Sequence, residues 1–148
     1  MSTYRNILAA IDFSPENRRI LDRAVDLAGK TGSRLTLLHV VEYTEFAYSG
    51  DLIAPEELAI DHELVGKAKE EMVKLQRELD LGELDARVEM GAPKREIVRI
   101  AEELEADLIV LGSHGRHGLQ LLLGSTANGV LHLAGCDVLA VRVGEQTA

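Results

Sequence analysis

The chain has 148 residues, of which 46% are hydrophobic, so it can bury a full core and we expect one domain over residues 1–148. Sixteen basic and twenty-five acidic side chains give a formal net charge of −9, which repels nucleic-acid phosphates and anionic membranes. Nucleic acid and membrane are therefore excluded as expected partners. The chain shows no signal-peptide core, no apolar run of transmembrane length and one cysteine, Cys136, so we expect a cytoplasmic protein with a buried thiol.

The first half of the chain alternates strand and helix patterns. Residues 6–11 form a short apolar run, and Ser14 and Pro15 suit the cap and first turn of a helix that ends near Lys30. Residues 34–41 predict a second buried strand. A three-four spacing of apolar residues then predicts another helix. The residues expected to face the core are Ile20, Leu21, Ala24, Val25 and Ala28 in the first helix, and Val65, Ala68, Met72, Leu75 and Leu79 in the second.

The second half of the chain repeats this alternation. Residues 86–90 predict a strand, a helix restarts at Pro93, residues 107–112 predict a strand, residues 124–134 a helix, and residues 137–143 the last strand. The inward-facing residues of these two helices are expected to be Ile97, Ile100, Ala101 and Leu104, followed by Ala127, Val130, Leu131 and Ala134.

These elements predict an α/β fold with a doubly wound sheet. Strands that are apolar throughout and separated by amphipathic helices indicate a parallel sheet with helices on both faces. We expect five strands in the order 3-2-1-4-5. Ligands of such sheets bind beyond the carboxyl ends of the strands, near the switch in strand order. Asp12, after the first strand, and the loop that begins at Gly112, after the fourth, should meet there.

A glycine-rich loop joins the fourth predicted strand to the last helix. Residues 112–126 read GSHGRHGLQLLLGST, and the glycines let backbone N–H groups approach phosphate oxygens. The helix that follows adds partial positive charge, and Ser125 and Thr126 add hydroxyl donors. His114 and Arg116 are candidate phosphate contacts. A tight turn without a ligand, with Arg116 in solvent, is the structural alternative.

Four segments resemble one known family, the universal stress proteins. NILAAIDFSPEN (6–17) is similar to the family's opening strand and turn, and LTLLHVVE (35–42) to its second strand. DLIVLGSHG (107–115) resembles its fourth strand with the loop, and GSTANGVLHLAGCDVLAVR (124–142) its closing helix and strand. The resemblance spans almost the entire chain. It implies a stress-response homodimer with an adenine nucleotide alpha hydrolase-like fold.

The resemblance also implies a ligand and an interface. The ligand would be ATP or AMP, with Mg²⁺ as an accompanying ion. Asp12 and Val40 would contact the adenosine, while the glycine loop and Ser125 would hold phosphates. The expected nucleotide-binding residues are Ala10, Asp12, Val40, Leu111, Gly112, His114, Gly115, Arg116, Gly124, Ser125 and Thr126. The expected dimer contacts, in the last strand, are Val138, Leu139, Ala140, Val141, Arg142 and Val143.

The loop departs from the family pattern in length. Nucleotide-binding members carry G-x2-G-x9-G-[S/T], whereas eight residues, 116–123, separate Gly115 from Gly124 here. Residues 43–53, YTEFAYSGDLI, resemble members that do not bind ATP. Three functions therefore stay open: a nucleotide-binding signalling module without efficient turnover, a slow ATP hydrolase, and a structural or interaction dimer that binds no nucleotide.

Asp12 itself has three interpretations. It is a ribose or adenine ligand, a magnesium ligand, or an acceptor for backbone N–H groups at the start of the following helix, and we favour the ligand role. The five histidines are scattered, and two on one loop, His114 and His117, are too few for a zinc site, so we expect no resident metal. Ser113 beside His114 is a neighbour pair without implied geometry, so we name no catalytic residue.

Overall fold

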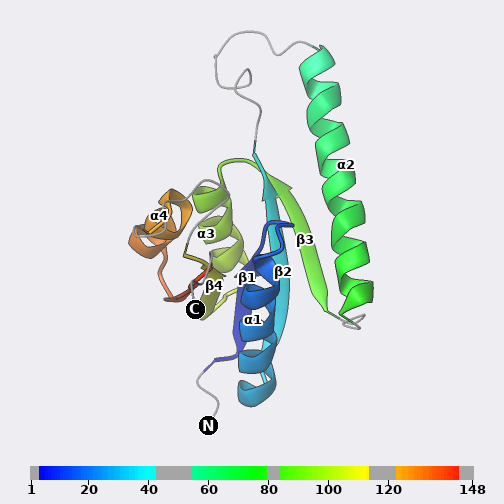
Figure 1. Cartoon of the computed structure of the whole chain (residues 1–148). Coiled ribbons are helices and arrows are strands. Elements are labelled where there is room, and N and C mark those ends of the chain that lie inside the picture. The colour runs from blue at the N-terminus through cyan, green and yellow to red at the C-terminus, as the bar shows by residue number, and fades with distance from the viewer. Residues whose placement is uncertain (1–3, 43–54, 80–83, 114–122, 144–148) are drawn as a thin grey trace.

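Strands and helices alternate along the whole described part of the chain. The structure, a computed structural model, describes residues 4–42, 55–79, 84–113 and 123–143 (Figure 1). In these ranges the elements are β1 (Asn6–Ala10), α1 (Asn17–Thr31), β2 (Arg34–Val41), α2 (Pro55–Glu78), β3 (Asp85–Met90), α3 (Pro93–Glu103), β4 (Leu108–Gly112), α4 (Ser125–Leu133) and β5 (Asp137–Val141). No helix in these ranges is long and apolar enough to cross a membrane.

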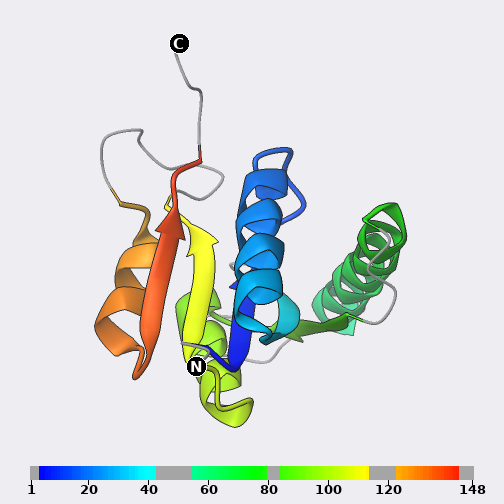
Figure 2. The same cartoon turned by 90° about the horizontal axis from the view of Figure 1, so that it is seen from below.

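The strands form one parallel sheet in the order β3-β2-β1-β4-β5. In the centre Ile7 of β1 is paired with Leu35 of β2 on one side and with Leu108 of β4 on the other. The chain therefore turns outward in opposite directions from β1, and the switch in strand order lies between β1 and β4 (Figure 2). The predicted doubly wound fold and its strand order are confirmed.

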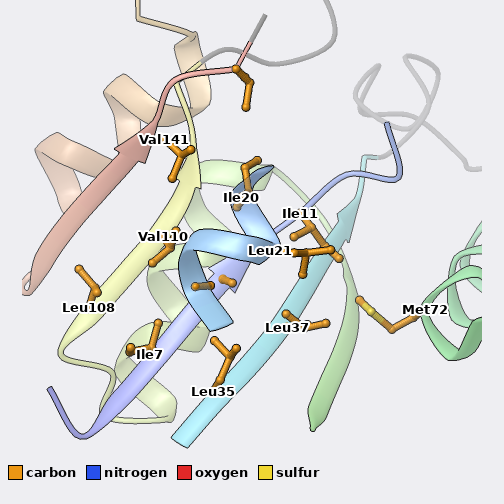
Figure 3. Close-up of a cluster of buried hydrophobic side chains, with 13 residues drawn as sticks. Ile7, Ile11, Ile20, Leu21, Leu35, Leu37, Met72, Leu108, Val110 and Val141 are labelled. Carbon is orange, nitrogen blue, oxygen red and sulfur yellow. The ribbon is translucent and has the colours of Figure 1, made fainter. Parts of the chain in front are cut away.

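Each face of the sheet carries its own core. On one face Ile20 and Leu21 of α1 and Met72 of α2 pack with strand residues such as Leu37 and Val110 (Figure 3). On the other face α3 and α4 cover the sheet, with buried residues Ile97, Ile100, Ala101, Ala127 and Val130. Each fully buried aliphatic side chain contributes about 1.5–3 kcal/mol, so these two clusters hold the strand ends in place.

Three helices differ in detail from the sequence-based prediction. Val25 in α1 is 36% exposed and Leu131 in α4 is 46% exposed, although both were expected to face the core. They flank the buried stripes of their helices, because the sheet covers a narrower arc of each helix than the apolar pattern suggests. In addition, α2 begins at Pro55, well before the apolar periodicity that starts at Val65.

The first helix begins at Asn17, later than the predicted start at Pro15. Residues 14–17 form a turn in which the Asn17 N–H donates to the Ser14 carbonyl at 3.1 Å. The N-cap residue is Glu16, and no side chain caps the helix, so the expected cap by Ser14 is wrong. Ser14 instead donates its backbone N–H to the Asp12 carboxylate, so it belongs to the β1–α1 connection and not to the helix.

The turn between β3 and α3 brings the start of α3 to the edge of the sheet. The Gly91 N–H donates to the Val41 carbonyl at 2.9 Å, and Gly91 has a φ of 152° that favours glycine. Pro93 then occupies the first turn of α3, where its missing N–H costs nothing. This turn places Pro93 and Ile97 beside the carboxyl ends of the central strands.

Candidate functional site

A cleft of about 460 Å³ lies at the carboxyl ends of β1, β2 and β4. Its walls come from the strand ends, the β1–α1 turn, and helices α1, α2, α3 and α4. The lining residues are Ala10, Ile11, Asp12, Phe13, Asn17, Ile20, Leu38, His39, Val40, Val41, Glu42, Leu64, Pro93, Ile97, Leu111, Gly112, Thr126 and Ala127. The cleft opens where the strand order switches, as the fold predicts.

The fold brings most of the described candidate residues together. The cleft is lined by Ala10 and Asp12 from β1 and its turn, Val40 from β2, Leu111 and Gly112 from β4, and Thr126 from α4.

Five other candidate residues lie elsewhere or outside the described ranges. Gly124 and Ser125 sit at the start of α4 and do not line the cleft. His114, Gly115 and Arg116 lie outside the described residues. The structure thus describes the two ends of the glycine loop. The phosphate contacts predicted for His114, Gly115 and Arg116 stay predictions.

The ends of the glycine loop are joined by a backbone hydrogen bond. The Gly124 N–H donates to the Ser113 carbonyl at 2.7 Å, and the Ser113 N–H donates to the Val141 carbonyl of β5 at 2.8 Å. The Ser113 hydroxyl also accepts the Val143 N–H at 3.4 Å. Residue 113 is therefore fixed against β5 and residue 124 against residue 113, so the two ends of the loop lie together beside the cleft.

Asp12 is held by donors from the β1–α1 turn. Its Oδ1 accepts the Ser14 N–H at 2.9 Å. The Asn17 side-chain amide donates Nδ2 to the Asp12 carbonyl oxygen and to Oδ1. Asp12 thus accepts a backbone N–H of the turn before α1, close to the structural role that the sequence left open. Its Oδ2 has no hydrogen-bond partner in the described part of the chain, so the carboxylate can still accept from a ligand.

Sequence reasoning missed His39, Phe13 and Asn17. The His39 ring bonds through Nδ1 to the Ile11 carbonyl at 2.8 Å and packs on Phe13 with ring centroids 4.5 Å apart at 45°. Because a carbonyl only accepts, Nδ1 carries the proton, and His39 fixes the end of β1 to β2. The available signal was a polar ring at the carboxyl end of an otherwise apolar strand, which sequence reasoning considered only for metal binding.

The described lining of the cleft carries acceptors and apolar surface but no fixed cation. Asp12 and the exposed Glu42 are its carboxylates, and neither lysine nor arginine lines it within the described ranges. Positive potential comes instead from the N-terminus of α4, where Thr126 lies. This distribution suits a neutral, hydroxyl-bearing group at Asp12 and an anionic group towards α4.

Metal and thiol chemistry have no centre in the described part of the chain. No group of three or more histidine, cysteine or carboxylate residues that could hold a metal is found there. Cys136 is half-buried rather than fully buried, and it lies before β5, away from the cleft. Burial and the neighbouring Asp137 carboxylate raise the pKa of its thiol, which lowers the thiolate fraction and hence its reactivity.

Comparison with known proteins extends these observations. The model of the universal stress protein family matches residues 3–142. Universal stress protein A homologs 1 and 2 of Coxiella burnetii are each 38% identical to this chain, over 142 and 144 residues. These alignments cover 96% and 97% of this chain and 99% and 98% of the two relatives.

Solved structures give the same result. The hypothetical protein MJ0577 superposes with a TM-score of 0.80 and 29% identity, covering 97% of this chain and 99% of that one. The universal stress protein UspA from Lactobacillus plantarum gives 0.78 and 28%, covering 96% and 100%. A universal stress protein in complex with cAMP gives 0.65 and 25%, covering 97% and 100%. The chain belongs to the universal stress protein family.

Proposed function

We propose that this chain is a cytoplasmic stress-response module that binds an adenine nucleotide, ATP or AMP, in the cleft and does not turn it over efficiently. The observation that carries the proposal is the cleft of about 460 Å³ at the strand switch, with the Asp12 carboxylate on its wall. In this arrangement Asp12 and Val40 hold the adenosine, and the phosphates lie towards α4 and the glycine loop.

The lining of the cleft fits a nucleoside. Clefts that bind small ligands are typically about 300–1,000 Å³ in volume and mostly apolar, with a few polar groups that set orientation. Here Val40 and Leu111 give apolar surface for a flat base, and Asp12 gives an acceptor for a ribose hydroxyl.

The start of α4 fits the phosphate end. Backbone N–H groups in the first turn of a helix have no partner within the helix and carry partial positive charge. Gly124 caps α4 in an extended conformation and no side chain occupies the cap. Support from outside comes from the solved universal stress protein that is in complex with cAMP, an adenine nucleotide. Among the described lining residues, Asp12 and Glu42 are the two carboxylates that would be available to a Mg²⁺ ion.

The chain's own residues bind and orient the ligand. In this proposal Asp12 accepts a hydrogen bond from a ribose hydroxyl and does not remove its proton. The Nδ1 of His39 is already hydrogen-bonded to the Ile11 carbonyl. Catalytic turnover needs a positioned base or nucleophile, and the described lining has no such pair in hydrogen-bond contact with one another. We therefore propose ligand-dependent signalling as the role.

Retained ligand provides the direct test of this proposal. Mass spectrometry of purified, tag-free protein after denaturation should release ATP or AMP, and calorimetry on the stripped protein should show rebinding. Phosphate release from ATP with and without Mg²⁺ separates a binding module from a hydrolase. Protein that neither carries nor rebinds an adenine nucleotide would contradict this proposal and favour the alternative, a structural or interaction dimer that binds no nucleotide.

We also propose a homodimer through β5. This strand lies at the edge of the sheet, and Val138, Leu139 and Ala140 are half-buried. In a parallel ladder the N–H and C=O groups of alternate residues point to opposite sides. The Val141 carbonyl points to β4, where it accepts the Ser113 N–H. The backbone groups of Val138 and Ala140 therefore point away from the sheet and can pair with a second copy.

A further inference from the structure

Asn17 is a buried polar residue whose side chain donates its hydrogen bonds to a single residue, Asp12. It is 5% exposed, and with Thr36 it is one of two buried polar residues in the described chain. A polar amide costs free energy to bury unless it forms hydrogen bonds. Asn17 meets this requirement by donating to the carbonyl oxygen and to Oδ1 of Asp12. Both partners belong to Asp12, so the amide holds the main chain and the carboxylate of that residue together.

The direction of these bonds separates Asn17 from a helix cap. An asparagine that caps a helix accepts a backbone N–H with its side-chain oxygen. Asn17 is instead the first residue of α1, and its amide presents nitrogen to two acceptors. Because both acceptors are oxygens, the amide orientation follows from the network. Both N–H groups of the amide are thereby used on Asp12.

The two carboxylate oxygens of Asp12 therefore differ in the number of hydrogen bonds that they accept. Oδ1 accepts from Asn17 and from the Ser14 N–H, which fills its two lone-pair positions. Oδ2 has no partner among the described residues and belongs to a side chain that lines the cleft. A carboxylate fixed in this way does not rotate to meet a ligand, so less entropy is lost on binding.

We propose that Asn17 is a positioning residue that holds the Asp12 carboxylate so that only Oδ2 accepts a ribose hydroxyl of the bound adenine nucleotide. This inference rests on the proposed nucleotide function and deepens it. It predicts that Asn17 acts through Asp12 and only on ligands that carry ribose hydroxyls. A residue that merely stabilised the turn would affect every ligand of the cleft equally.

Calorimetry with AMP and 2′,3′-dideoxy-AMP tests the proposal on the full chain. Asn17→Ala should weaken AMP binding about tenfold, equivalent to about 1.4 kcal/mol, and should change 2′,3′-dideoxy-AMP binding by less than about twofold. In an Asp12→Ala background, the same Asn17 exchange should leave AMP affinity unchanged within about twofold, because two residues acting through one contact are not additive. Asn17→Ser, which keeps one short donor, should fall between wild type and Asn17→Ala.

A matched control is Thr36→Val. Thr36 is buried to the same degree, at 6% exposed, and lies in β2 without lining the cleft. This variant tests whether loss of a buried polar group alone lowers affinity, and it should bind both nucleotides like wild type.

The outcomes separate this inference from the function on which it rests. Wild-type protein that binds AMP, with equal affinity in Asn17→Ala or with equal losses for AMP and 2′,3′-dideoxy-AMP, would overturn the positioning role alone. Additive losses in the Asp12→Ala background would do the same. Wild-type protein that binds no adenine nucleotide would overturn both. If Asn17→Ala does not fold, Asn17→Ser with the same two ligands decides the question.

Discussion

Asp12 carries the proposed contact with the nucleoside, so removing its carboxylate tests that contact directly. Asp12→Ala should weaken binding of ATP and AMP by about 1–3 kcal/mol, the free energy of a lost hydrogen bond to a charged group. Calorimetry measures this loss, and circular dichroism checks that the β1–α1 turn still folds. Equal affinity in a folded variant would leave Asp12 with a structural role alone, as the acceptor for the Ser14 N–H and the Asn17 amide.

Gly91 tests the turn that delivers α3 to the cleft. A Cβ added there would lie 2.8 Å from the Glu96 Cγ atom, and the φ of 152° disfavours any L side chain. Gly91→Ala should therefore lower the free energy of unfolding by about 1–3 kcal/mol. The matched exchange is Gly66→Ala in α2, where nothing lies within 4 Å and alanine should stabilise the helix by about 0.5–1 kcal/mol. Urea unfolding of both variants would show whether their effects have opposite signs.

At the scale of an element, β5 is the predicted dimer contact. Ala140→Pro removes a backbone N–H that points away from β4, so it should disrupt pairing with a second copy while leaving the β4–β5 ladder in place. Sedimentation at micromolar concentration should show a dimer for wild type and a monomer for the variant. A wild-type chain that sediments as a monomer would contradict the prediction.

The glycine loop is one residue shorter than the family's nucleotide-binding pattern, which shortens its reach by up to about 3.5 Å. Its ends are fixed by the bond between Ser113 and Gly124, so an added residue has to extend the loop itself. Insertion after Gly118 should raise ATP affinity relative to AMP, because phosphate contacts improve while Asp12 is untouched. Calorimetry of both proteins with both nucleotides provides the measurement. Wild type that already prefers ATP at least tenfold, about 1.4 kcal/mol, would show that the shorter loop costs nothing.

At the scale of the whole molecule, a ligand in the cleft should stabilise the fold, because the cleft is built from three strands and the starts of α3 and α4. A nucleotide at about 100 times its dissociation constant adds about 2.7 kcal/mol, which corresponds to a rise in Tm of roughly 5–10 °C for a chain of this size. Thermal unfolding with AMP measures the rise, and Asp12→Ala at the same AMP concentration should show a smaller one. An unchanged Tm with millimolar AMP would count against binding.

The order of elements, the parallel sheet and the edge at which a ligand would lie were predictable from the sequence. These features follow from local periodicity. Largely apolar strands such as residues 34–41, separated from one another by amphipathic helices, are typical of a parallel sheet with helices on both faces. The meeting of Asp12 with Gly112 also followed from the sequence, because the carboxyl ends of parallel strands share one edge. The family resemblance, carried by the strand ends and the glycine loop, is confirmed over residues 3–142.

The arrangement of individual side chains in the cleft could not be predicted in this way, because it depends on how the elements pack. Asn17 and His39 carry no motif, and their roles come from the β1–α1 turn and from β2 lying beside β1. Val25 was wrongly assigned to the core because apolar periodicity marks a helix face but not the width of the contact with the sheet. The physical reason is common to these residues: periodicity is a property of one element, whereas burial and hydrogen-bond partners depend on how two elements pack.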